Sequence, residues 1–312
     1  MGHRGSTGTS ECPLGRVRLL PSFVAMALLL ALSIGPSRAR ADEPSARPHV
    51  FYILSRLAMP RIDPGELPAE ARPSYQRVLA TDARLMALAH NRPIARVDYD
   101  VAEGANQHAS TELEQQLARH ARELEGTAWL VYGEMLFRRS SIRWMDEMDA
   151  MSHADEHGDA TVPEPQLDFT DAIAAYQQAS ARSGGSFLGA WARYFEAHAR
   201  TESASSACDA QALVAFSIVA AEASAQVAAD ARLRLGECAF EQGRWGLAAA
   251  WYRRAAAREA PERLARIINY KLAWALWLAG DWAAAQEVIS RMDPDVPDEI
   301  RAELELLRVT PP

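Results

Sequence analysis

The stretch Ala248-Ala249-Ala250-Trp251-Tyr252 contains the pattern that decides the fold, an alanine followed four residues later by a large apolar side chain. The same pairing recurs as Ala172 with Tyr176, Ala212 with Phe216 and Ala285 with Ile289. Successive copies begin 40, 36 and 37 residues apart. Residues four apart share one face of a helix, so each copy predicts a helix with a close neighbour at its alanine. A period of this length predicts an all-α solenoid of stacked helical pairs.

A second helical pattern precedes these copies, and it fits the first half of a tetratricopeptide repeat, W-x2-L-G-x2-Y. Leu235-Gly236 lies seven residues before the turn residue Gly243, and Leu272-Ala273 has the same relation to Gly280. Equivalent positions in the two earlier units are held by Trp129 with Gly133 and by Trp191 with Tyr194. One such pair of helices cannot bury its apolar face alone. The units are therefore expected to stack into a continuous right-handed solenoid with a concave surface.

Two stretches of the last clear unit, residues 270–276 (YKLAWAL) and 278–282 (LAGDW), resemble the exported tetratricopeptide proteins of myxobacteria and their relatives. The resemblance covers about residues 110–297. It implies a first repeat interrupted by an acidic insertion that ends in prolines, here about residues 140–168. Arg232 and Asn269 depart from the pattern because they stand where it prefers tryptophan, and Ala273 replaces its glycine.

The remaining boundaries follow from turn residues and helix caps. We expect an N-terminal arm over residues 42–73, a helix over 74–90 and a connector to residue 109. A capping box formed by Thr111 and Glu114 then opens the first repeat. The helix after Phe169 should pair with the unit around Trp129 across the insertion. Residues 298–312 should end the stack as a capping helix, with Ile300, Leu304 and Leu307 on one face.

The first 41 residues read as a secretory signal. Arginines precede an apolar run over residues 23–34, which is shorter than the about 20 residues that a transmembrane helix needs. Ala39 and Ala41 form an A-x-A site for cleavage before Asp42. We therefore expect a periplasmic or secreted protein with no transmembrane segment in the mature chain.

The net negative charge of the mature chain limits the class of partner that it can bind. Without the signal, the chain carries 28 basic and 40 acidic residues, and no basic stripe is present that could neutralise phosphates. We therefore expect no nucleic-acid partner. The mature chain keeps only Cys208 and Cys238, which could form one disulfide in an oxidising compartment or remain as two buried thiols.

The expected partner site is the concave groove, which would hold a peptide or helix of another envelope protein. Charged and aromatic side chains on the first helices of the units would line it. These residues are Glu196, Arg200, Glu237, Phe240, Glu241, Tyr270, Trp274 and Trp277, with Glu134, Arg138 and Leu233 nearby. The aromatic stripe Tyr270, Trp274 and Trp277 has a second interpretation, because such a stripe on a repeat helix also serves as core packing. Both interpretations predict a non-enzymatic scaffold without a cofactor.

Two alternatives come from other features. His153, Glu156 and His157 match the H-x-x-E-H spacing of zinc metalloproteases, although Gly158 should end a helix there and no further metal ligand stands at a matching spacing. A zinc-dependent hydrolase is therefore one alternative function. A structural spacer that oligomerises through its N-terminal helices is the other.

Overall fold

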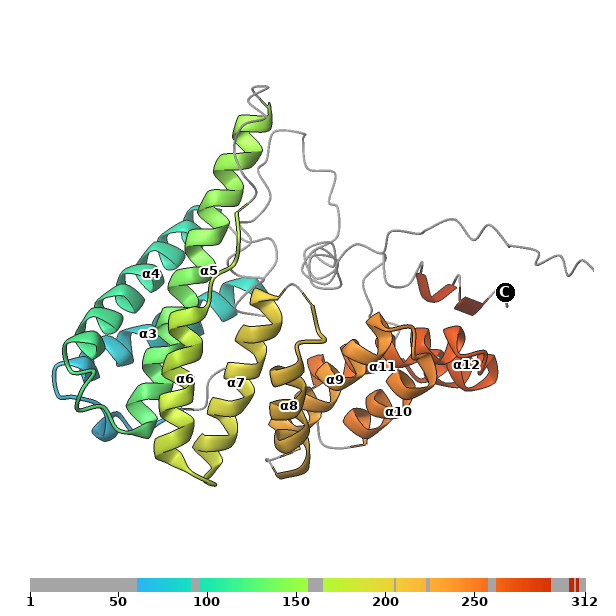
Figure 1. Ribbon diagram of the computed structural model, residues 1–312. Helices are drawn as coiled ribbons and strands as arrows, with labels where there is room; N and C mark the ends of the chain where they lie inside the picture. The colour runs from blue at the N-terminus through green and yellow to red at the C-terminus, as the bar shows by residue number, and fades with distance from the viewer. Residues whose placement is uncertain are drawn as a thin grey trace, which may run out of the picture.

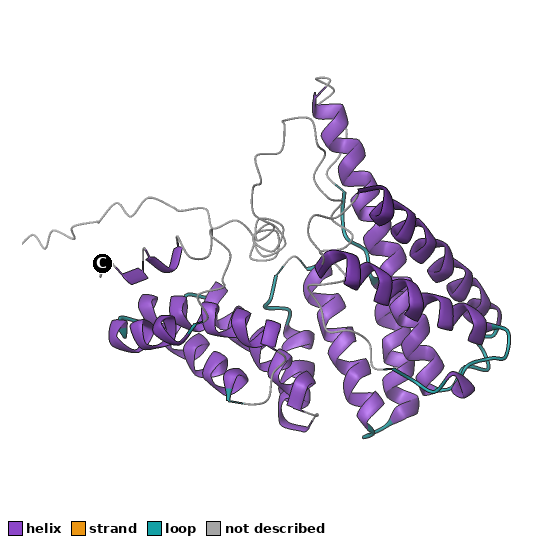
Figure 2. Cartoon of the chain, turned by 180° about the vertical axis from the view of Figure 1, so that it is seen from behind, coloured by secondary structure: helices purple, strands orange, loops and turns teal. Residues whose placement is uncertain are grey.

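A computed structural model describes residues 61–90, 96–156, 165–204, 206–222, 225–257, 262–292, 303–305 and 307–308. The expected signal sequence, its cleavage site before Asp42 and the arm up to residue 60 lie outside these residues. All regular structure in the described part of the chain is helical (Figure 2). None of the described helices combines the length and the apolar character needed to cross a membrane.

The helices follow one another in space in the order of the sequence, from α3 at one end to α12 at the other (Figure 1). Each helix packs against the next, and α5, α7, α9 and α11 also contact one another in turn, as expected for a solenoid of helical pairs. The bounds are η1 Pro64–Glu66, α3 Ala71–His90, α4 Arg96–Arg119, α5 Gly126–Glu156, α6 Thr170–Ser183, α7 Phe187–Ser203, α8 Ala210–Glu222, α9 Ala225–Glu241, α10 Trp245–Ala256, α11 Glu262–Leu278 and α12 Trp282–Arg291.

The four alanine and large-residue pairs lie on α6, α8, α10 and α12, and all eight side chains are buried. Two of the large residues, Tyr176 and Tyr252, each pack their ring directly against a glycine of the preceding helix. A Cβ atom added to Gly133 of α5 would lie 2.6 Å from the Tyr176 ring, and one added to Gly236 of α9 would lie 2.4 Å from the Tyr252 ring. The small residue therefore sets how closely the two helices of a unit approach.

Replacing Gly236 with alanine should lower the free energy of unfolding by about 1 to 3 kcal/mol, because a methyl group overlaps the buried Tyr252 ring. Gly246, in the first turn of α10, is the matched control. A Cβ atom there meets no heavy atom within 4 Å, so Gly246→Ala should raise stability by up to about 1 kcal/mol or leave it unchanged. Urea unfolding of both variants measures the difference. Equal effects at the two glycines would mean that Gly236 does not set the helix spacing.

The N-terminal boundaries differ from the prediction. Helix α4 begins at Arg96, so Thr111 lies inside a helix instead of capping one, and no long connector separates α3 from α4. The buried positions of α4 explain the error, because several hold small or polar side chains that give no clear apolar period. The buried positions of α4 are Ala102, Glu103, Asn106, Ala109, Ser110, Leu113 and Leu117. Residues 62–71, expected to belong to the arm, are already part of the fold, since Ile62 and Leu67 are buried in it.

The expected insertion is partly helix. Helix α5 continues to Glu156, and Met145 on this extension is buried. Trp144 Nε1 donates a hydrogen bond to the Pro165 carbonyl oxygen at 3.2 Å, so the returning chain lies along α5. The pairing of α5 with α6 across the interruption is confirmed, with the rings of Phe137 and Phe169 stacked 4.2 Å apart.

The C-terminal residues that the structure describes pack as expected. Leu304 and Leu307 are buried against Ala273 of α11 and Ile289 of α12. Ile300, the third residue of the expected apolar face, lies outside the described residues. Leu304 and Leu307 therefore cover the apolar end of the last helical pair.

Cys208 and Cys238 form a disulfide. The bond joins the connection between α7 and α8 to α9, with the two Cα atoms 4.8 Å apart. It therefore links two successive helical pairs covalently.

Candidate functional site

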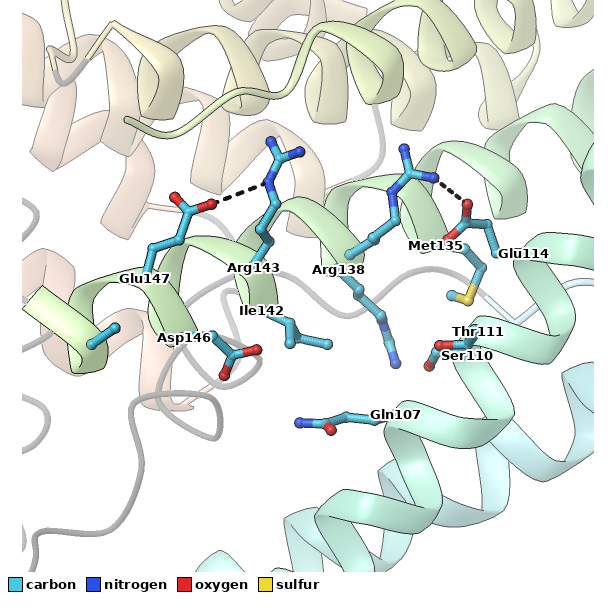
Figure 3. Close-up of a pocket in the computed structure, with 12 residues that line it drawn as sticks. Gln107, Ser110, Thr111, Glu114, Met135, Arg138, Ile142, Arg143, Asp146 and Glu147 are labelled. Carbon is cyan, nitrogen blue, oxygen red and sulfur yellow. Dashed lines mark hydrogen bonds and ion pairs between the residues drawn. The ribbon is translucent and has the colours of Figure 1, made fainter. Parts of the chain in front are cut away.

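A groove of about 450 Å³ lies between α4 and the part of α5 from Met135 to Ala150 (Figure 3). Side chains of the two helices face one another across it. Helix α5 projects beyond its described neighbours at this end of the molecule (Figure 1). The lining residues are Gln107, Ser110, Thr111 and Glu114 from α4, and Met135, Arg138, Arg139, Ile142, Arg143, Asp146, Glu147 and Ala150 from α5.

Arg138 forms the most tightly bound part of the groove floor. Its guanidinium donates two hydrogen bonds of 2.8 Å to Asp82 of α3 and one of 2.9 Å to Glu134 of α5. Burial alone would lower the pKa of Arg138, but the attraction of Asp82 and Glu134 outweighs it and raises the pKa. This charge is therefore fully committed to joining α3 to α5 and is not available to a ligand.

Arg139 holds the edge of the groove next to α6. It donates hydrogen bonds to Glu114 of α4 at 2.5 Å and to Asp171 of α6 at 3.0 Å. Burial raises the pKa of Glu114, and the neighbouring Arg139 offsets this only in part. Arg139 and Glu114 thus fix the distance between the two walls.

The remaining polar groups of the groove can form further hydrogen bonds or ion pairs with a ligand. Ser110 Oγ is buried and has no hydrogen-bond partner among the described residues. Arg143 and Glu147 are exposed and only 3.9 Å apart, a contact that contributes little to stability. Since Met135 is buried and Ile142 half-buried beside them, the groove combines apolar side chains with polar groups that can still bind a ligand. Peptide-binding grooves have this composition.

The expected partner residues of α7 and α9 are engaged inside the protein. Glu196 accepts hydrogen bonds from Arg200 and from Gln177 of α6 at 2.9 Å. Glu241 is exposed but accepts a hydrogen bond from the Ala207 amide at 3.1 Å. Phe240 packs edge-to-face on Trp245, with ring centroids 4.7 Å apart.

Glu237 differs most from the expectation, because only 2% of its side chain is exposed. Its carboxylate lies 3.1 Å from Arg234 and also pairs with Lys271 of α11. Burial raises the pKa of Glu237, but Lys271 and Arg234 outweigh it, so the pKa lies below its usual value. Glu237 joins two helical pairs and cannot present a charge to a partner.

This lowered pKa predicts acid sensitivity. A carboxylate with a depressed folded-state pKa contributes stability above its unfolded pKa, and that contribution is lost as the pH falls through the folded value. The loss should therefore begin below the ordinary glutamate pKa of 4.5. Glu237→Gln should be less stable than wild type at pH 7 and should lose less stability between pH 5 and pH 3. Parallel denaturation curves for the two proteins across this range would contradict the assignment.

The aromatic stripe on α11 contacts the C-terminal segment. Tyr270, Trp274 and Trp277 are all half-buried and pack against the cluster that contains Leu304 and Leu307. The Tyr270 hydroxyl also donates a hydrogen bond to Glu303. These contacts agree with the packing interpretation of the stripe.

The zinc hypothesis gains no support from this geometry. His153 is exposed in the last turn of α5, while His157 lies outside the described residues. Within the described part of the chain, no three histidine, cysteine or acidic side chains are grouped as metal ligands.

Comparison with known proteins finds no match, since no family model, no curated protein and no solved structure is significantly similar to this chain.

The sequence prediction missed the α4–α5 groove because it ended one wall in a connector before residue 110 and the other in an insertion from about residue 140, so it did not place two long helices side by side. One signal was available. Met135, Ile142 and Met145 recur at helical spacing and cross the expected start of the insertion at residue 140, which indicates a helix that continues past it.

Proposed function

We propose that this protein is an exported scaffold of the tetratricopeptide type in a bacterial envelope, and that it binds a peptide or helix of another envelope protein in the α4–α5 groove. Consecutive helical pairs, close glycine contacts under Tyr176 and Tyr252, and glycine turns at Gly243 and Gly280 support the repeat type. The disulfide between Cys208 and Cys238 supports an oxidising compartment, where such bonds persist.

The proposal that this protein binds a peptide rests on the properties of the α4–α5 groove. Ser110 Oγ is a buried hydroxyl with no partner among the described residues, and an unmade hydrogen bond of this kind costs about 1 to 3 kcal/mol. A peptide backbone offers the amide and carbonyl groups that would satisfy it. The residues expected to bind partners on α7, α9 and α11 are already engaged, which leaves this groove as the better candidate.

Capture of partners from an envelope extract by the immobilised protein tests the proposal. Ile142→Glu places a charge on the half-buried apolar part of the groove and should weaken capture of a specific partner by about tenfold or more. Val214→Glu is the matched control, because Val214 is 62% exposed on α8, away from the groove. Thermal melting establishes that both variants are folded. Equal capture by the folded Ile142→Glu variant and the control would remove the groove as the binding site.

A further inference from the structure

The segment of residues 50–59 (VFYILSRLAM) is unusually apolar for the region in front of the fold. It contains Phe51, Tyr52, Ile53, Leu54, Leu57 and Met59 within ten residues. From residue 44 to residue 62 the chain also carries three arginines and no carboxylate, although the protein as a whole is acidic. An apolar and basic segment of this kind needs a surface that covers its side chains and offers it a negative charge.

The segment enters the described fold next to the buried cluster that reaches the groove. Ile62 is buried, and its amide donates a hydrogen bond of 3.2 Å to the Tyr75 hydroxyl. Ile62 and Met135 belong to the same buried cluster, and Met135 lines the α4–α5 groove. Ten extended residues reach about 33 Å, which exceeds the about 23 Å that α5 rises along the groove from Met135 to Ala150.

The chemistry of the groove fits this segment. Met135 and Ile142, with the aliphatic stems of the groove arginines, provide apolar contact for aromatic and aliphatic side chains. Ser110 Oγ can bond the peptide backbone. Asp146 is exposed and has no ion pair among the described residues, so it can receive Arg56. We propose that residues 50–59 dock in the α4–α5 groove of the same chain, an inference that rests on the proposed binding role of that groove.

An occupant tethered in this way competes with any partner in solution. A segment joined by a short linker has an effective local concentration of about millimolar, so a partner must displace it to bind. The docked segment would thus set a threshold for partner binding, and its removal would increase the affinity of the groove.

A photo-crosslinking residue tests the docking in the full chain. With p-benzoylphenylalanine in place of Phe51, irradiation of the purified protein should join residues 50–59 to residues 107–114 or 135–150 of the same chain. Thr111→Arg, which adds a charge of the same sign as Arg56 at an exposed position of α4, and Ile142→Glu, which places a charge on the apolar part of the groove, should each lower this crosslink yield by about tenfold. The same probe in place of Phe187, which is 54% exposed on α7, should give no crosslink to the groove.

The location of the crosslink decides the outcome. A crosslink to another part of the fold, a crosslink between two chains, or a yield unchanged in both groove variants would overturn the docking. The capture experiment with Ile142→Glu remains a separate test. A partner that depends on Ile142 while residue 51 crosslinks elsewhere would leave the groove as a binding site but exclude the segment as its occupant.

Discussion

Replacing Arg234 with alanine should lower the free energy of unfolding by about 3 to 5 kcal/mol. Only 3% of the Arg234 side chain is exposed, and it lies 3.3 Å from Asp230 and 3.1 Å from Glu237. These two carboxylates are themselves buried and are bonded to Tyr194 of α7 and Lys271 of α11, so the network joins three successive units. Without Arg234, Asp230 would lose the cation with which it pairs and Glu237 would lose a cation that it shares with Lys271, and both carboxylates are too deeply buried for water to replace it.

Arg253 provides the matched control for this substitution. It pairs with Asp281 at 3.6 Å, but both side chains are about half exposed, and an exposed pair of this kind contributes about 0 to 1 kcal/mol. Chemical denaturation of Arg234→Ala and Arg253→Ala should therefore give clearly different losses of stability. If the two variants were equally stable, the charges on α9 would not hold the units together.

Loss of the disulfide between Cys208 and Cys238 should lower the free energy of unfolding by about 3 to 4 kcal/mol. The two cysteines are 30 residues apart, and a crosslink that closes a loop of this length restricts the unfolded chain by about that free energy. The double variant Cys208→Ala, Cys238→Ala removes the crosslink and leaves small apolar side chains at both positions. Denaturation under oxidising conditions measures the loss.

A reducing agent supplies the control. It should destabilise the wild-type protein by the same amount as the double substitution and should leave the double variant unchanged. Wild-type protein that is equally stable with and without the reductant would contradict a stabilising role for the bond.

The repeat could be predicted from the sequence because only a small residue fits where two helices are in close contact. Ala248 and Gly236 are small because Tyr252 and the neighbouring helix occupy the space around them. The N-terminal unit could not be read in the same way. Its contacts use Ala102 and Asn106, which also occur on exposed surfaces and so give no clear period.

The candidate site was predicted less well, for a physical reason. A charged residue at a repeat position can face a partner or pair with another charge of the same chain. Its spacing in the sequence is identical in the two cases, so the sequence does not distinguish them. Glu237 shows the second case, because its partner Lys271 lies 34 residues away in the sequence. The α4–α5 groove likewise depends on two helices whose relation only the folded structure shows.

The most direct test of the binding proposal is a photo-crosslinking residue at Thr111, an exposed position in the groove, in cells that produce and export the full chain. The same probe at Ala181, exposed on α6, is the control. The proposal predicts a crosslink from residue 111 to one envelope protein that is absent from residue 181. Crosslinks that are the same at both positions, or that join residue 111 to no other protein, would contradict it.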